Sequence, residues 1–536
     1  MDSSGYSEAL SAWAQAIGEG KVVNAPDSIE LYRQNVTGLE REIPGILVPT
    51  STEDVQRIVE IANQYMLPLW AFSTGRNWGM GSKLPAKNGC TIVDLHKMDK
   101  IRHVDTTHNY AVIEPGVTQG MLWEHLRSRN LNYVFDATGS GRDTSIIGNA
   151  LDMGKGYNSE RFESLSGLEV VLGNGKILRT GFGHFAESNS TYLYKYGIGP
   201  HLDGLFAQSN YGIVTSAGFK LDPPSKCHAV FICNLNKKGD FPHFMDILAK
   251  LRRNGDVNTV VHISNRARTR ISLAPLLYDY FSKNGAGNNA ELYAAIDSRF
   301  EGPEFSDWSA LGGLAGSKLE VTQSIMKVVM AMRGIAKFTV FTDSLIKTAK
   351  WLGNHGIPYF KKQKPLLEVI EPVYNLTKGI PTNVSLKSVF WPVQGEYPPQ
   401  NMMEPDWSHS GLSHYLPIVP NDGATVQRTT DAIEAIFSEF GFSPFITLNM
   451  INKEALEGVV NLSFDRRSVE QKQKAQDCIQ KVHTELMKEG ILPFRVGIQN
   501  RELITDENDP YWQTIRDLKS VLDPNNIMNP GRYNLI

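Results

Sequence analysis

Apolar and polar positions in the first third of the chain recur with the periods of short strands and amphipathic helices. From Val55 onward, apolar residues return at the spacing of one helix face, and Ser51 or Thr52 stands where a helix cap is expected. The apolar run 67–72 that follows predicts a buried strand. The same patterns predict helices at 6–20 and 119–129 and strands at 44–49, 91–95, 101–104 and 110–114.

The later part of the chain mixes both periods. Asn174-Gly175 between two apolar runs predicts a hairpin over 167–180, and Pro223-Pro224 marks a domain boundary near residue 225. The segment 378–425 is rich in Pro, Gly, Trp and Tyr, so we do not expect it to form one regular element. Beyond the boundary we expect strands at 228–234, 445–452 and 458–464, and helices near 241–254, 320–350, 425–440, 467–488 and 510–522. These elements together predict an α+β protein.

Two glycine-rich loops are the candidates for chemistry. Residues 73–81 hold three glycines directly after the predicted strand 67–72. Glycine allows close approach of the backbone, so successive N–H groups of this loop could converge on a diphosphate. The loop matches neither common glycine-rich nucleotide fingerprint, and an ordinary surface turn is the alternative. The second loop, 136–149, is polar and ends in an apolar helix start, as expected of a loop that covers a ligand.

Composition narrows the choice of partners. The formal net charge of −3 gives no basic surface for nucleic acid, and the four cysteines lack the clustering of metal ligands. No signal-peptide pattern opens the sequence, and no apolar run approaches the roughly 20 residues of a membrane helix. We therefore expect a soluble cytoplasmic protein with free thiols, without metal, nucleic acid or membrane.

A set of short motifs, taken in order, is more specific than any one of them. It begins with the 73–81 loop, continues through Glu114-Pro115-Gly116-Val117-Thr118 and Gly148-Asn149, and closes with Asp523-Pro524-Asn525-Asn526-Ile527. This series resembles the vanillyl-alcohol oxidase / p-cresol methylhydroxylase family of flavoproteins. The match is dense over 44–222 and returns at 490–532.

The resemblance implies FAD as cofactor and a specific division of the chain. Residues 1–225 would form the FAD-binding domain, of the type named after p-cresol methylhydroxylase, from two α+β subdomains, and 490–536 would return to it. Residues 226–489 would form a cap with an antiparallel sheet flanked by helices. The implied cofactor contacts are Ser73, Thr74, Gly75, Arg76, Asn77, Trp78, Gly79, Met80, Pro115, Gly116, Val117, Thr138, Gly139, Ser145, Gly148, Asn149, Gly156, Tyr157, Gly212, Ile213, Val214 and Arg532.

The chain departs from the family where the family holds a phenol. Two tyrosines and an arginine bind the phenolate in relatives, whereas this sequence has Met80 and Phe494 in the tyrosine places and keeps Arg495. Neither methionine nor phenylalanine donates a hydrogen bond to an oxyanion. The family's flavin-side aspartate is replaced by Gly139 or Ser140, depending on a one-residue shift. A simple 4-alkylphenol is therefore not the expected substrate.

Several residues have two interpretations. Arg495 either stabilises negative charge on the substrate or forms a structural ion pair. His414 is either a pocket residue, the point of covalent FAD attachment, or a packed histidine; a gapless match puts Leu412 at the linking position. Non-covalent FAD is the preferred interpretation. Candidates for the base are Asp143, Glu160, Tyr157 and His414. Met80, Phe494, Trp391 and Tyr415 are candidate pocket walls, with core packing as the alternative for the last two.

The leading hypothesis is an FAD-dependent oxidase. It would take a hydride from an alcohol or a benzylic C–H bond of a small substrate and pass the electrons to O2, giving hydrogen peroxide. A dehydrogenase with another electron acceptor and a non-catalytic FAD-binding protein are the alternatives. A berberine-bridge type of oxidase is disfavoured, because Asn77 stands where that group links FAD and 136–149 holds no cysteine. The resemblance also implies a homodimer or a higher homo-oligomer.

Overall fold

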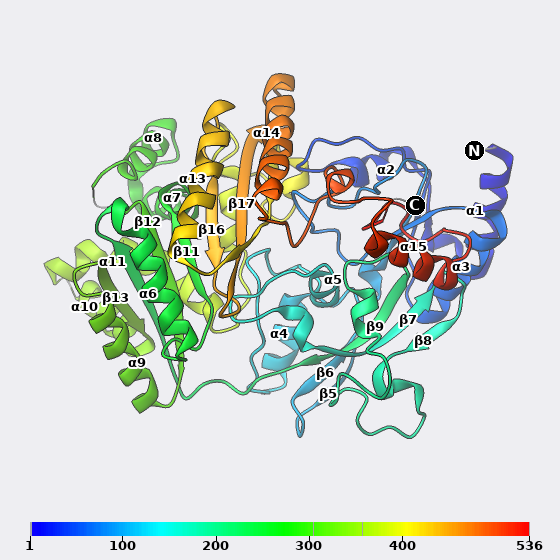
Figure 1. The fold of residues 1–536 in the computed structure, drawn as a ribbon, viewed down its shortest axis with the longest axis horizontal. Coiled ribbons are helices and arrows are strands. Elements are labelled where there is room, and N and C mark those ends of the chain that lie inside the picture. Colours follow the sequence, from blue (N-terminus) through cyan, green and yellow to red (C-terminus); the bar gives the residue numbers. More distant parts are fainter. Residues whose placement is uncertain (1–2, 304, 356, 535–536) are drawn as a thin grey trace.

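The protein is described here from a computed structural model covering residues 3–303, 305–355 and 357–534. Its strands form a four-stranded, a five-stranded and an eight-stranded sheet, and helices cover them (Figure 1). The predicted α+β class is confirmed. The first two sheets come from the chain before residue 225, and the eight-stranded sheet comes from the chain after it.

The first sheet carries the glycine-rich loop. Its strand order is β1-β2-β4-β3, with β2, β4 and β3 running parallel. Helix α3 follows β2 and buries its apolar face, and Ser51 Oγ accepts a hydrogen bond from Asp54 N at 3.1 Å as its cap. The bounds are α1 Ser3–Ile17, β1 Val22–Val23, α2 Pro26–Arg33, β2 Ile46–Leu47, α3 Thr52–Tyr65, β3 Leu69–Phe72 and β4 Thr91–Asp94.

The second sheet is antiparallel in the order β5-β6-β9-β7-β8. The predicted Asn174-Gly175 turn joins β7 to β8, and Gly175 has the positive φ of 81° that such a turn requires. Helices α4 and α5 pack on this sheet in one apolar cluster. The bounds are β5 Ile101–Asp105, β6 Tyr110–Ile113, α4 Gln119–Ser128, α5 Ile146–Leu151, β7 Leu165–Leu172, β8 Ile177–Arg179 and β9 Gly212–Lys220.

The third sheet has the order β13-β10-β12-β11-β16-β17-β14, with β15 also paired to β17. Helices α6, α13 and α14 lie along one face of it and share its largest apolar cluster (Figure 1). The bounds are β10 Cys227–Leu235, α6 Phe241–Arg253, β11 Val261–Asn265, α7 Arg266–Phe281, α8 Ala290–Arg299, β12 Trp308–Gly316, α11 Pro358–Thr377, α12 Lys387–Phe390, β14 Ser410–Tyr415, β15 Ile418–Pro420, α13 Gly423–Glu439, β16 Phe445–Asn449, β17 Ala455–Asp465 and α14 Val469–Lys488.

The C-terminal segment crosses back to the first sheet. Helix α15 (Pro510–Leu522), drawn in red near α3 and β7 in Figure 1, matches the predicted helix. Beyond it, Met528 bridges Leu69 at the start of β3, and Asn529 Oδ1 accepts a hydrogen bond from Ala71 N at 2.7 Å. The last residues of the described chain therefore lie beside the strand that leads into the first glycine-rich loop.

One predicted element was wrong. The helix expected over 320–350 is divided into α9 (Lys318–Ala331), strand β13 (Ala336–Thr342) and α10 (Asp343–Asn354), because Gly334 turns the chain with φ 83° and 336–342 then pairs with β10. The segment 378–425 forms no single regular element, as expected, and it contains the short strands β14 and β15. Both strands pair with β17, which is at least 35 residues away in sequence, so no local signal predicted them.

Candidate functional site

The first glycine-rich loop presents free backbone donors. The N–H groups of residues 74–79 donate to no residue that the structure describes. The loop leaves β3 and turns at Gly75 and Gly79, whose φ values are 68° and 76°. A run of unpaired N–H groups in such a turn is an anion-binding concavity. The loop therefore has the unpaired N–H groups that a diphosphate-binding loop, as predicted from the sequence, would need.

The second loop is tied to the first through Ser145. Ser145 N donates to Thr74 Oγ1 at 3.2 Å, and Ser145 Oγ donates to Pro115 O at 2.6 Å and accepts from Gly148 N at 2.9 Å. At Gly148, an added Cβ would stand 2.5 Å from Ser73 Oγ, so only glycine allows this approach. Three segments singled out in the sequence thus meet at one place.

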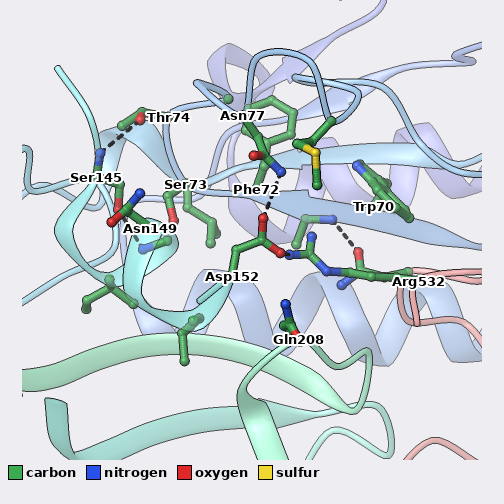
Figure 2. Close-up of a pocket in the computed structure, with 18 of the residues that line it drawn as sticks. Trp70, Phe72, Ser73, Thr74, Asn77, Ser145, Asn149, Asp152, Gln208 and Arg532 are labelled. Carbon is green, nitrogen blue, oxygen red and sulfur yellow. Dashed lines mark hydrogen bonds and ion pairs between the residues drawn. The ribbon is translucent and has the colours of Figure 1, made fainter. Parts of the chain in front are cut away.

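A cleft with about 1070 Å³ of empty space opens between these loops, β9 and the C-terminal segment (Figure 2). Among the predicted residues, the cleft is lined by Ser73, Thr74, Gly75, Arg76, Asn77, Met80, Ser145, Gly148, Asn149, Gly212, Ile213, Val214, Arg495 and Arg532. Lining residues that the sequence analysis missed include Trp70, Phe72, Asp152, Gln208 and Arg501.

Asp152 is the ionic centre of the cleft. It pairs with Arg495 and, at 3.0 Å, with Arg532, and it accepts a hydrogen bond from Asn77 Nδ2 at 2.9 Å (Figure 2). Burial alone would raise the pKa of Asp152, but the two guanidinium groups outweigh it and hold the pKa below its usual value. Arg495 is thus in an ion pair, which is one of the two roles that the sequence left open.

A second group of polar side chains lies where the third sheet meets the loops; we call it the seam. It is defined by Tyr157, His262, Arg268, Ser385 and His414. His414, on β14, places Nδ1 2.8 Å from Asn461 Oδ1 and Nε2 3.1 Å from Trp78 O. Burial lowers the pKa of His414 to about 4, so the ring is neutral at pH 7.

Tyr157 reaches the seam from the other side. Its ring lies 4.7 Å from that of His262, whose Nε2 is 3.2 Å from Tyr157 O. Burial raises the pKa of the Tyr157 phenol, against the opposing effects of the Arg268 guanidinium and the Ser385 hydroxyl. The phenol is therefore protonated at neutral pH and is a hydrogen-bond donor. An added Cβ at Gly139 would stand 3.2 Å from Ser385 Oγ and 3.7 Å from the Tyr157 ring.

A buried ionic cluster borders the seam. Lys155 Nζ lies 2.6 Å from Glu457 and 3.5 Å from Glu160, and it stands 4.9 Å above the Phe494 ring. Burial raises the pKa of Glu457 to about 7, although Lys155 opposes that shift. Glu160, a candidate base, is therefore engaged by Lys155. Phe494 O accepts a hydrogen bond from Gln208 Nε2, which links this cluster to the cleft.

The structure does not bring the other candidates to the seam. Asp143 is 45% exposed and lies 3.4 Å from Arg76. Trp391 packs in an apolar cluster, stacked on Tyr293 with ring centres 4.0 Å apart. Tyr415 is fully buried and donates to Ile491 O at 2.8 Å. Trp391 and Tyr415 are thus packed in the core, which is the alternative that the sequence left open for them.

Comparison with known proteins shows that the chain is similar to FAD-dependent enzymes. The chain matches the FAD binding domain family over residues 43–181 and the C-terminal domain of FAD linked oxidases over 460–533. It is 26% identical to the 4-cresol dehydrogenase (hydroxylating) flavoprotein subunit of Pseudomonas putida, over 98% of this chain and 95% of that protein. These similarities support the p-cresol methylhydroxylase / vanillyl-alcohol oxidase family of FAD-dependent oxidoreductases.

Three further proteins are similar to nearly the whole chain in sequence or in fold. The 1'-carboxy-chondrochloren decarboxylase of Chondromyces crocatus is 28% identical over 99% of this chain and 98% of its own. The crystal structure of p-cresol methylhydroxylase with substrate bound superposes with a TM-score of 0.84 at 25% identity, over 99% of this chain and 97% of that one. The 4-ethylphenol oxidase of Gulosibacter chungangensis has the same fold, with a TM-score of 0.84 at 23% identity.

The residues of the cleft fit the family's cofactor, FAD. The free N–H groups of residues 74–79 are suited to the diphosphate, and Arg532 and Arg501 add positive charge to the same cleft. Burial lowers the pKa of Arg501 only to about 10, so it remains a cation at neutral pH. These groups would hold FAD along the cleft, with the seam at the contact between the loops and the third sheet.

Among the described residues, no helix is long and apolar enough to span a membrane. In the same part of the chain, no group of three or more His, Cys, Asp or Glu side chains is arranged to hold a metal ion. The four cysteines are free thiols.

Proposed function

We propose that this protein oxidises a small substrate at a C–H bond next to a hydroxyl group or an aromatic ring and transfers the electrons to O2. The observation that carries this proposal is the seam, where side chains of the third sheet contact the loops of the FAD cleft. His414 contacts Trp78 O, and His262 contacts Tyr157 O. When bound, FAD accepts a hydride from the substrate.

The seam residues have separate roles in the proposal. Tyr157, protonated at neutral pH, donates a hydrogen bond to the substrate oxygen and stabilises negative charge that develops there. His414 positions the first glycine-rich loop, because both of its ring nitrogens already have partners. Arg495 acts on the cofactor side of the site, since Asp152 already offsets its charge. We propose no dedicated base, because Asp143 and Glu160 are both engaged by cations.

O2 as electron acceptor and non-covalent FAD are part of the same proposal. Gly139 keeps the space beside Tyr157 free of a side chain, which favours access of a small oxidant. A bond from FAD to His414 would have to displace Asn461 or Trp78 from the ring. Leu412, at the family's linking position, is an apolar side chain with no group for such a bond. A dehydrogenase is the second candidate, because a similar protein carries the name 4-cresol dehydrogenase.

The test begins with purified protein that holds FAD. The protein is precipitated with acid, and we expect the flavin absorbance to stay in the supernatant. Anaerobic protein is then mixed with benzylic alcohols, 4-alkylphenols and aromatic carboxylates, and bleaching of the flavin band is followed. The carboxylates are included because one relative is named a decarboxylase, so release of CO2 is measured as well.

Air-saturated buffer and a redox dye then separate the two acceptors. Peroxide formed in step with substrate loss supports the oxidase, whereas turnover with the dye alone supports the dehydrogenase. We expect Tyr157→Phe to lower kcat by about 100-fold while FAD content is retained. A protein that binds FAD and is bleached by no substrate of the panel would contradict the proposal and favour a non-catalytic role.

A further inference from the structure

Arg268 is a cation without an ionic partner at the seam. It lies in the first turn of α7, directly after β11, and its backbone N donates to the capping Asn265 Oδ1 at 2.9 Å. Its half-buried guanidinium makes no hydrogen bond and no ion pair with any described residue. Partial removal of a guanidinium from water without a carboxylate partner costs free energy, so this position requires an explanation.

The neighbouring carboxylates already have cations of their own. Glu457 and Glu160 are paired with Lys155, and Asp152 is paired with Arg495 and Arg532. The groups that the charge of Arg268 does reach are Tyr157 and His414, both of which are neutral at pH 7. The chain thus surrounds this cation with neutral hydrogen-bonding groups.

The two other arginines near the start of α7 each have a carboxylate partner. Arg266 lies 3.2 Å from Asp307, and Arg270 lies 3.6 Å from Asp297. These arginines stand two residues before and two after Arg268, so they lie on other faces of the helix. Among the three arginines, the missing partner is therefore particular to Arg268, whose charge acts on Tyr157.

Arg268 lies outside the cleft whose residues fit FAD. The cleft that fits the cofactor has Arg495, Arg501 and Arg532 in its lining, and Arg268 is not among its residues. A second, smaller anion on the other side of the seam would satisfy Arg268. One unpaired cation matches a single negative charge, and the planar guanidinium fork matches a carboxylate.

We propose that Arg268 binds a carboxylate of the substrate, so that this protein acts on anionic molecules where relatives act on phenols. This inference rests on the proposed function for the identity of the seam as the substrate site. In it, Arg268 replaces as an anchor the two tyrosines that the chain lacks at Met80 and Phe494. The carboxylate would be oriented with the adjoining carbon chain directed toward Tyr157.

The test measures binding to the FAD-loaded protein and needs no turnover. The probes are 4-hydroxyphenylacetate and its neutral amide, which have nearly the same shape, and each is titrated while the flavin absorbance spectrum and the heat of binding are recorded. We expect the wild-type protein to bind the carboxylate about 10- to 100-fold tighter than the amide. Arg268→Met should remove this preference, and Arg268→Lys should retain part of it.

Arg270→Met is the matched control, because it removes a cation of the same helix from a surface pair. It should leave the preference for the carboxylate unchanged. FAD affinity is measured for every variant. An unchanged preference in Arg268→Met would overturn the inference, and so would a loss of FAD affinity in both Arg268 variants without a change in carboxylate preference.

The two proposals fail in different ways. If carboxylates bind through Arg268 but no substrate bleaches the flavin, the proposed reaction is wrong and the anion site stands. If neutral alcohols are oxidised and Arg268→Met leaves their kcat/KM unaltered while carboxylates do not bind, the reaction stands and the anion site is wrong.

Discussion

The half-buried arginines of the cleft have an ionic partner, whereas the half-buried arginine of the seam has none among the described residues. In the cleft, Arg495 and Arg532 converge on Asp152, and their positions are fixed before any ligand enters. In the seam, Arg268 has no such partner among the described residues, and the groups that it reaches are neutral. A prearranged ionic network suits a cofactor that stays bound. An unpaired cation suits a ligand that enters and leaves, because the binding energy is then available to that ligand.

Asp152→Asn should have the largest effect. It leaves Arg495 and Arg532 buried without a carboxylate, and removing one partner of a buried pair costs about 3–5 kcal/mol. We expect a lower unfolding midpoint by thermal denaturation and a lower FAD content. Arg268→Met should change the midpoint much less, because it breaks no pair. Equal losses in the two variants would contradict the contrast between the two regions.

Gly79→Ala tests the contact between the two regions. The new Cβ would lie 2.4 Å from the His414 ring, on a backbone with φ 76°. Strain of this kind costs about 1–3 kcal/mol, and the collision with His414 adds to it. The control is Gly441→Ala, which has the same φ of 76° and no heavy atom within 4 Å. Unfolding should show a greater loss for position 79; similar losses would mean that backbone strain alone is responsible.

The neutral His414 should make the protein sensitive to acid. Its pKa is lowered to about 4 by burial, against 6.5 in the unfolded chain, so unfolding takes up a proton between these values. Stability is therefore lost as pH falls below 6.5, by up to about 2 kcal/mol at pH 5. Measured against His414→Gln, wild type should lose relative stability from pH 7 to pH 5.

This comparison isolates His414 from groups that titrate in the opposite direction. Burial raises the pKa of Asp136 to about 6 and that of Glu457 to about 7, which favours the folded state as pH falls. Both groups are present in wild type and variant, so their contributions cancel in the difference. A difference that does not depend on pH would show that His414 does not change its protonation on unfolding.

The smallest effect is expected at Arg270. Its ion pair with Asp297 joins two side chains that are each about 30% exposed. Such surface pairs contribute about 0–1 kcal/mol, so Arg270→Met should shift the unfolding midpoint little. If Arg270→Met lowered the unfolding midpoint as much as Asp152→Asn, the exposure of an ion pair would not predict its contribution to the stability of this protein.

Local signals were sufficient for much of the cofactor side. The cap and the apolar spacing of α3, the Asn-Gly turn between β7 and β8, and the bounds of α15 follow from short stretches of sequence. The glycine-rich loop could also be predicted, because glycine spacing after a buried strand is itself a local pattern. In the cap, the division of 320–350 and the strands within 378–425 depend on pairing with distant strands, and no local pattern encodes it.

The seam was harder to predict for the same reason. Tyr157 and His414 could be named as candidates because the resemblance pointed to their surroundings. Arg268 was missed, because an arginine in a helical stretch that also holds Arg266 and Arg270 looks no different from its neighbours. What distinguishes it is the absence of a partner in the folded chain, and only the assembled structure can show that.

The sequence by itself predicted the family, the cofactor, and the loops proposed to bind it, since each of these predictions rests on residue types at short spacing. The tertiary structure alone decided which charges are neutralised. Asp152 and Arg495 are 343 positions apart, and they meet only because the C-terminal segment returns to the first sheet. Electrostatic energy depends on distance in space and on burial, and neither quantity can be predicted from a short stretch of sequence.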